Sequence, residues 1–198
     1  KTPLTALSND VVRLRAARQS EIADDIEETA MRMRQIVERE LARSRIRSVH
    51  VQSKPVSVAS AAHSIIRTLE RTPQGEGKTF VNTAGADAMA AVDPNDLNDI
   101  LGTLIENAAR AAKSTVLVSA RREGLHVAIE VSDDGPGVPE QLLSKLTERG
   151  RRLDQSSGSA GLGLSLVAEI LEAYGSKPRF TASKLGGLGV SFTLPAAA

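Results

Sequence analysis

Residues 132–137 read Ser-Asp-Asp-Gly-Pro-Gly and directly follow an alternating stretch, 125–132, that predicts a β-strand. A carboxylate held at the end of a strand can accept a hydrogen bond from an exocyclic amine. The glycines at 135 and 137 would let the backbone approach a flat ring closely. A plain Asp-Gly turn without a ligand explains the same residues, so this stretch alone leaves both interpretations open.

The segment before the predicted strands indicates a long helix with polar groups along one flank. Asp93-Pro94 is a typical helix start, and apolar residues then recur every three or four positions. Thr103, Asn107 and Arg110 line one flank of this helix. The amide oxygen of Asn107 could bind Mg²⁺, and Arg110 could meet phosphate charge. A solvated polar flank is the alternative.

Two further glycine-rich stretches follow. Residues 158–165 read Gly-Ser-Ala-Gly-Leu-Gly-Leu-Ser and lead into a helix predicted over 162–174. Free N–H groups at such a helix start suit a phosphate chain, although a helix entry without a ligand is equally consistent. No Lys follows these glycines as in a P-loop, and no strand immediately precedes them as in a dinucleotide fingerprint. Residues 186–189, Gly-Gly-Leu-Gly, predict a hairpin turn.

The remaining segments complete a prediction of fold class. A helix is expected over 58–71, weak strands over 78–81 and 88–92, and clearer strands over 115–121 and 125–132, joined by Arg-Glu-Gly. A hairpin of 179–183 with 190–194 closes the chain. The prediction is an α+β domain over 58–198, a two-layer α/β sandwich with its helices on one face of the sheet.

The first 48 residues predict a separate helical hairpin. Apolar residues step by three and four along 4–14 and again along 22–36, with Arg and Glu between them. One hairpin cannot bury such a narrow stripe alone, so we expect a partner hairpin and a dimeric four-helix bundle. Packing of the hairpin on its own domain is the alternative. Residues 49–57, interrupted by Pro55, predict the linker.

Composition excludes several classes of function. The 25 Lys and Arg residues nearly balance the 24 Asp and Glu residues, which argues against a nucleic-acid binder that works through bulk charge. The absence of Cys excludes disulfides, thiol catalysis and Cys-ligated zinc. The three His residues are scattered, which makes a His-built metal site improbable. No apolar run approaches the roughly 18 residues of a membrane span.

In order and spacing these elements resemble the sensor histidine kinases of two-component signalling. Asn107 and its helix are similar to the N box, Asp133, Gly135 and Gly137 to the G1 motif, and residues 161–164, Gly-Leu-Gly-Leu, to the G2 motif. Residues 186–187 and 192–195 resemble the closing motif, and about 138–160 takes the place of the ATP lid. Residues 1–5, Lys-Thr-Pro-Leu-Thr, resemble the tail of the H box. The resemblance implies a HisKA-type dimerisation hairpin and a GHKL (Bergerat) ATP-binding domain.

The resemblance also implies roles for individual residues. Asp133 would bind the adenine amino group, Asn107 would hold Mg²⁺, and Arg110 would reach phosphate. The implied catalytic residues are Thr2, which would aim water during dephosphorylation of a response regulator, together with Arg110, Arg149 and Arg152. The implied nucleotide-binding residues are Asn107, Arg110, Asp133, Gly135, Gly137, Gly161, Leu162, Gly163, Leu164 and Thr193.

The chain departs from the family pattern in three places. The phosphoacceptor His would lie just upstream of Lys1, outside this chain. Thr103 stands where the family has its first N-box Asn. The third departure is a loss of aromatic residues: Ala111 stands where one is common after the N box, and Leu146 and Thr147 occupy aromatic positions in the lid. Lid packing and the metal environment are therefore expected to differ from the family.

The expected function is transfer of the γ-phosphoryl of Mg·ATP to that upstream His and then to a response-regulator Asp, with dephosphorylation of the regulator as a second activity. The expected partners are a second copy of the chain, through residues 1–48, and a receiver domain. We expect a cytoplasmic fragment of a protein anchored in the bacterial inner membrane. A nucleotide-binding switch and a GHKL-type ATPase are the alternatives. The ATPase is disfavoured because those enzymes carry a Glu base where this chain has Thr103.

Overall fold

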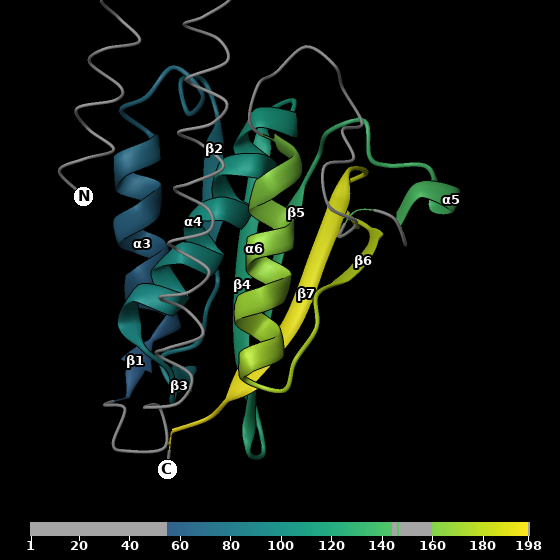
Figure 1. The fold of residues 1–198 in the computed structure, drawn as a ribbon. Coiled ribbons are helices and arrows are strands. Elements are labelled where there is room, and N and C mark those ends of the chain that lie inside the picture. Colours follow the sequence, from purple (N-terminus) through teal and green to yellow (C-terminus); the bar gives the residue numbers. More distant parts are fainter. Residues whose placement is uncertain (1–54, 144–145, 147–159, 198) are drawn as a thin grey trace, which may run out of the picture. The chain divides into compact units, whose positions relative to one another are not determined.

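A computed structural model describes residues 55–143, 146 and 160–197, which belong to one compact unit spanning 49–198 (Figure 1). The predicted hairpin over 1–48 and most of the predicted lid lie outside the described residues. The described helices are α3 (Val58–Leu69), α4 (Pro94–Ala111), α5 (Glu140–Leu143) and α6 (Ala160–Ala173). The strands are β1 (Val56–Ser57), β2 (Thr79–Asn82), β3 (Met89–Ala90), β4 (Thr115–Glu123), β5 (His126–Asp133), β6 (Arg179–Ala182) and β7 (Leu188–Pro195).

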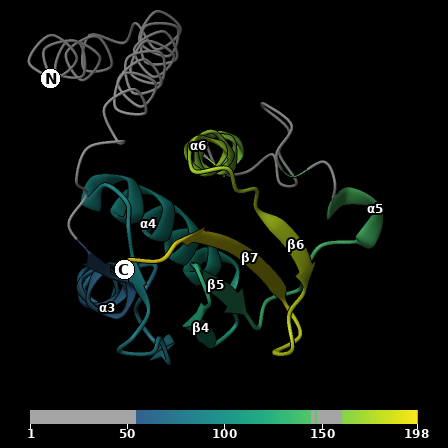
Figure 2. The same cartoon turned by 90° about the horizontal axis from the view of Figure 1, so that it is seen from below.

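The architecture is a mixed sheet with helices on one face. Strands are ordered β2-β4-β5-β7-β6, with β2 parallel to β4 and every other neighbouring pair antiparallel. Helices α4 and α6 run side by side on one face of this sheet, and α3 packs against α4 (Figures 1 and 2). This arrangement is the predicted two-layer α/β sandwich. No helix of the described residues is both long enough and apolar enough to cross a bilayer.

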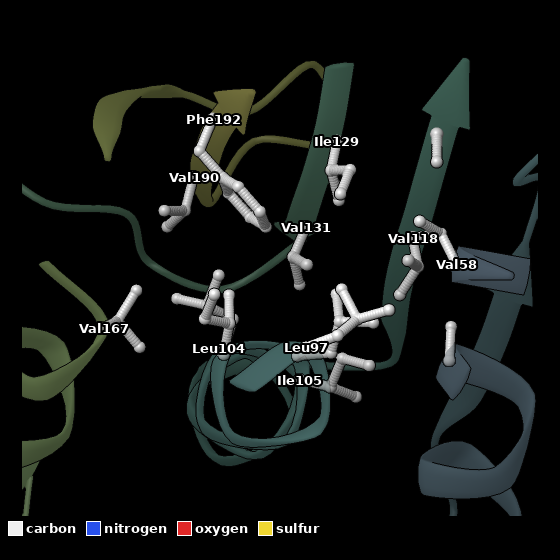
Figure 3. Close-up of a cluster of buried hydrophobic side chains, with 14 of the residues drawn as sticks. Val58, Leu97, Leu104, Ile105, Val118, Ile129, Val131, Val167, Val190 and Phe192 are labelled. Carbon is white, nitrogen blue, oxygen red and sulfur yellow. The ribbon is translucent and has the colours of Figure 1, made fainter. Parts of the chain in front are cut away.

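The core lies between α4, α6 and the inner face of the sheet (Figure 3). The strand period of two turns Val127, Ile129 and Val131 of β5 inward, each at most 2 % exposed. The helical period turns Leu97 and Leu104 of α4 toward them, also at most 2 % exposed. The core described here is almost entirely aliphatic, which agrees with the scarcity of aromatic residues in the sequence.

Element boundaries differ from the predicted ones at a few points. The turn between β4 and β5 is Gly124-Leu125 rather than Arg-Glu-Gly, because Gly124 takes the left-handed conformation with φ +60°. Strand β4 extends beyond its predicted end at 121 to Glu123, β5 has the predicted length but is shifted by one residue to His126–Asp133, and α6 begins at Ala160 rather than at 162. Residues 56–57, at the end of the predicted linker, form β1, and the side chain of Ser57 accepts a hydrogen bond from the Ser60 N–H as the N-cap of α3.

The N-terminus of α4 begins as the sequence predicts and is tied to the end of α6. Asp93 is the N-cap and Pro94 the first helical residue. Asp96, only 6 % exposed, accepts a hydrogen bond from the Tyr174 hydroxyl at 2.6 Å, and that hydroxyl accepts one from the Asp93 N–H at 3.1 Å. Burial, reinforced by the hydrogen bond to Asp96, raises the pKa of the Tyr174 phenol.

Replacing Tyr174 with Phe is expected to lower the free energy of unfolding by about 1–3 kcal/mol, because it removes a donor to a buried carboxylate. A raised folded-state pKa means that this stabilisation is complete below the ordinary tyrosine value of 10.0 and is lost as the pH rises above it. Urea denaturation followed by circular dichroism at pH 7 and at pH 11 tests both statements. A native-like stability of the Phe variant at pH 7 would contradict them.

Candidate functional site

Asp133 ends β5 and is only 3 % exposed. One of its carboxylate oxygens, Oδ1, accepts hydrogen bonds from the N–H of Gly135 at 2.8 Å and of Leu188 at 3.3 Å. No described residue donates to the other oxygen, Oδ2. Since no buried side-chain oxygen or nitrogen of the described part lacks a partner, Oδ2 reaches the surface. The site therefore presents one oriented acceptor from an otherwise enclosed carboxylate.

Burial dominates the electrostatics of Asp133. It raises the pKa of this carboxyl, and the N–H groups of Gly135 and Leu188 oppose the shift only in part. The neighbouring Asp134 charge raises the pKa further. Carboxyl groups whose pKa is raised by burial are found preferentially at binding and catalytic sites, which makes Asp133 a candidate ligand-binding residue.

Glycines pack directly against Asp133. A Cβ at Gly187 would collide with Oδ1 of Asp133 and lie 2.6 Å from the Gly135 nitrogen. A Cβ at Gly135 would collide with the Ala111 carbonyl oxygen at the end of α4. The sequence predicts Gly187 as part of a hairpin turn and of the closing motif, and neither indicates its contact with Asp133, because the two residues are far apart in the chain. Gly187 therefore packs directly against the Asp133 carboxylate.

The polar flank of α4 is internally paired. Arg110 donates to the Glu106 carboxylate at 3.0 Å, as an i,i+4 ion pair, and to the Asn107 amide oxygen at 3.4 Å. The Asn107 oxygen that the sequence assigns to Mg²⁺ is thus in contact with a guanidinium. A partly exposed ion pair contributes only about 0.5 kcal/mol, so an anionic ligand could displace Glu106 from Arg110 at little cost.

The first turn of α6 lies against the same flank. A Cβ at Gly163 would lie 2.8 Å from the Thr103 methyl group and 4.0 Å from the Asn107 amide nitrogen. The structure therefore brings the start of α6, the end of a helix whose N–H groups have no partner within the helix, to the predicted metal residue. Gly161 and Leu162 belong to that first turn, and Leu164 packs against the core.

Thr193, which the resemblance implies to be a nucleotide-binding residue, does not lie with this group. The strand period turns Phe192 and Leu194 into the core, so Thr193 is exposed on the opposite face of the sheet. It pairs in register with Ala128, far along β5 from Asp133, and its N–H donates to the Ser176 hydroxyl at 3.3 Å. There Thr193 helps to line a cavity of about 830 Å³ on the face turned away from α4 and α6.

Of the predicted site residues, Thr2, Arg149 and Arg152 lie outside the described residues. Asn107, Arg110, Asp133, Gly135 and the start of α6 converge from three elements: the end of α4, the end of β5 and the first turn of α6. Gly137 comes two residues after Gly135 and has a φ angle of +70°. A Cβ at Gly137 would lie 3.3 Å from the Gly187 carbonyl oxygen. The site is assembled from three separate segments of the sequence between residues 107 and 163.

Solved structures share this fold. A mycobacterial sensor histidine kinase, MprB, superposes with a TM-score of 0.64 and 22% identity, covering 72% of this chain and 98% of its own. Full-length ShkA in complex with AMPPNP gives a TM-score of 0.65 and 21% identity, covering all of this chain and 44% of its own. These likenesses confirm the GHKL ATPase-type α+β fold.

Curated proteins with similar sequences are sensor proteins. The sensor protein kinase CarS of Pseudomonas aeruginosa is 35% identical over 98% of this chain and 44% of its own length. The sensor protein PhoQ of Escherichia coli K12 is 29% identical over 94% of this chain and 39% of its own. This chain spans less than half the length of either relative. Residues 92–198 match the family described as histidine kinase-, DNA gyrase B- and HSP90-like ATPases, which supports ATP binding. The chain therefore belongs to this ATPase family.

Proposed function

We propose that the described domain binds Mg·ATP and serves as the catalytic domain of a sensor histidine kinase. The observation that carries the proposal is the Asp133 carboxylate, whose Oδ1 is held by two backbone N–H groups while Oδ2 has no donor among the described residues. An acceptor presented in this way suits the 6-amino group of adenine. The glycines at 135 and 187 let the backbone pack directly against the Asp133 carboxylate, where a side chain would displace it.

The residues of α4 and α6 fit the triphosphate and its metal. A single amide oxygen, that of Asn107, matches the sparse protein ligation that Mg²⁺ accepts alongside water and phosphate oxygens. Arg110 would leave its ion pair with Glu106 and bind phosphate instead. The N–H groups of the first turn of α6 would donate hydrogen bonds to phosphate oxygens. When bound, Mg²⁺ would neutralise charge on the phosphates. Positioning and charge neutralisation are the main requirements of phosphoryl transfer.

The remaining steps rest on the resemblance and on residues that the structure does not describe. The γ-phosphoryl would pass to a His upstream of Lys1 and then to an Asp of a response-regulator receiver domain. Arg149 and Arg152 would neutralise charge on the transferring group, and Thr2 would aim water during dephosphorylation of the regulator. The protein would act as a homodimer through residues 1–48, in the cytoplasm, and be anchored in the inner membrane through upstream segments.

Of the two alternatives, the ATPase is disfavoured by a specific observation. Direct hydrolysis needs a general base near the attacking water, and the family position for it holds Thr103, whose methyl group faces Gly163. The neighbouring carboxylate, Glu106, is paired with Arg110 at 3.0 Å. A nucleotide switch would use the same binding residues without transfer, so only an assay of chemistry separates it from a kinase.

The test uses a longer form of the protein that contains the upstream histidine, incubated with γ-labelled Mg·ATP. We expect label on the protein that is lost in acid and retained in alkali, as for phosphohistidine. Steady release of inorganic phosphate without such label would identify an ATPase. ATP binding with neither label nor phosphate release would identify a switch and overturn the kinase proposal.

A further inference from the structure

Asp134, beside the proposed adenine-binding residue, binds the turn that follows α4. Its Oδ1 accepts hydrogen bonds from three consecutive backbone N–H groups, those of Lys113 at 2.9 Å, Ser114 at 3.0 Å and Thr115 at 3.0 Å. Its Oδ2 accepts one from the Ser114 hydroxyl at 2.6 Å. Successive N–H groups that converge on one carboxylate form an anion-binding nest. The nest here holds a side chain of the protein itself.

The turn that holds Asp134 is a fixed extension of α4. The Ala112 N–H closes the last turn of the helix on Ala108 at 2.8 Å. The Lys78 ammonium donates to the carbonyl oxygens of Ala112, the C-cap of α4, at 2.5 Å and of Lys113, just beyond the helix, at 3.1 Å. Asp134 therefore attaches its loop to α4 itself, only a few residues from Asn107.

The same loop carries the Asp133 carboxylate. The Asp134 N–H donates to the Thr115 carbonyl oxygen at 3.2 Å, and the next residue, Gly135, supplies the 2.8 Å N–H that orients Asp133. The hydroxyl and N–H of Ser114, followed by the N–H of Thr115, lower the pKa of Asp134, so it is anionic throughout the physiological range. The Asp134 carboxylate therefore carries its negative charge, and can hold the three N–H groups, at any pH near neutrality.

We propose that Asp134 is a positioning residue for nucleotide recognition, fixing the Asp133 carboxylate relative to the Asn107 end of α4. The inference rests on the proposed binding of ATP and goes beyond it, since Asp134 is not expected to touch the nucleotide. A residue that merely stabilised the turn would change how much protein is folded. A positioning residue changes how well the folded protein distinguishes a base with a 6-amino group from one without it.

The experiment measures this discrimination with the full chain. Calorimetry gives Kd values for adenosine triphosphate and for purine riboside triphosphate, which lacks the 6-amino group. A hydrogen bond to a charged acceptor predicts a ratio of about 10- to 100-fold for the native chain. Asp134→Ala is expected to lower this ratio at least about fivefold. Asp134→Asn should keep most of it, because the amide oxygen can accept the three N–H groups and its NH₂ can donate to Ser114.

Tyr174→Phe is the matched control, because it weakens the fold at the opposite end of α4. It should leave the ratio unchanged. A native ratio in Asp134→Ala, measured on protein that circular dichroism shows to be folded, would overturn the inference. Where Asp134→Ala does not fold, Ser114→Ala removes only the hydroxyl donor, and an unchanged ratio there would overturn it equally. A ratio near one in the native chain would instead contradict the role of Asp133, and the inference would fall with it.

Discussion

Replacing Asp133 with Asn is expected to abolish measurable ATP binding while leaving the domain folded at least as stably as before. The amide keeps an oxygen where Oδ1 accepts from Gly135 and Leu188, so the loop geometry survives. At the Oδ2 position the variant has an NH₂ group, which cannot accept a hydrogen bond from the adenine amine. The variant loses the charge-assisted hydrogen bond to adenine and places its NH₂ group against the adenine amine, so that two donors face each other. We therefore expect the affinity for ATP to be at least about 100-fold weaker.

The stability half of this prediction follows from the sign of the pKa shift. Burial raises the pKa of Asp133 above its ordinary value of 3.8. A raised pKa contributes stability only when the group is protonated, below that ordinary value, and the contribution is lost as the pH rises through the folded-state pKa. At pH 7 the ionised, buried carboxylate therefore costs stability. The neutral Asn removes this cost, so urea denaturation at pH 7 should show an equal or higher free energy of unfolding.

Calorimetric titration with Mg·ATP and urea denaturation of the same samples check the two halves together. Asp87→Asn, at an exposed carboxylate outside the site, is the control and should match the native chain in both. Near-native affinity in Asp133→Asn would show that another group accepts the adenine amine. Weak binding accompanied by a clear loss of stability would mean that Asp133 holds the fold rather than the nucleotide.

Features that depend on neighbouring residues could be predicted from the sequence. Asp93-Pro94 starts α4 because a cap and a fixed proline φ act locally. The alternation of β5 placed Asp133 at its end, because the strand period is a local property. The resemblance added the order of the motifs, and the structure brings Asn107 and Gly163 together as that order implies.

Features that depend on pairing between distant segments could not be predicted in this way. Tyr174 and Asp96 meet across 78 residues, and the Asp134 nest joins the ends of two elements 20 residues apart. Thr193 was assigned to the site from its motif, although strand alternation turns it to the other face. A motif fixes where a residue lies along the chain, whereas sheet register decides which face it occupies.

Gly187→Ala is expected to abolish ATP binding and to lower the free energy of unfolding by about 1–3 kcal/mol, as for other overpacked positions. The φ angle of Gly187 is not in the left-handed region, so the cost is steric rather than conformational. The new methyl group would collide with Oδ1 of Asp133 and lie 2.6 Å from both its carbonyl oxygen and the Gly135 nitrogen. Two of these three atoms are backbone, so relief requires the Asp133 loop itself to move.

Gly102→Ala separates this effect from a general response to a glycine replacement. Gly102 lies in α4, and a Cβ there has no heavy atom within 4 Å. Alanine should raise the free energy of unfolding by about 0.5–1 kcal/mol through helix propensity and leave ATP affinity unchanged. Urea denaturation and calorimetry of the two variants provide the comparison. If Gly187→Ala lost stability but bound ATP normally, the turn would be only a packing element, because a displaced Asp133 could not keep its hydrogen bond to adenine.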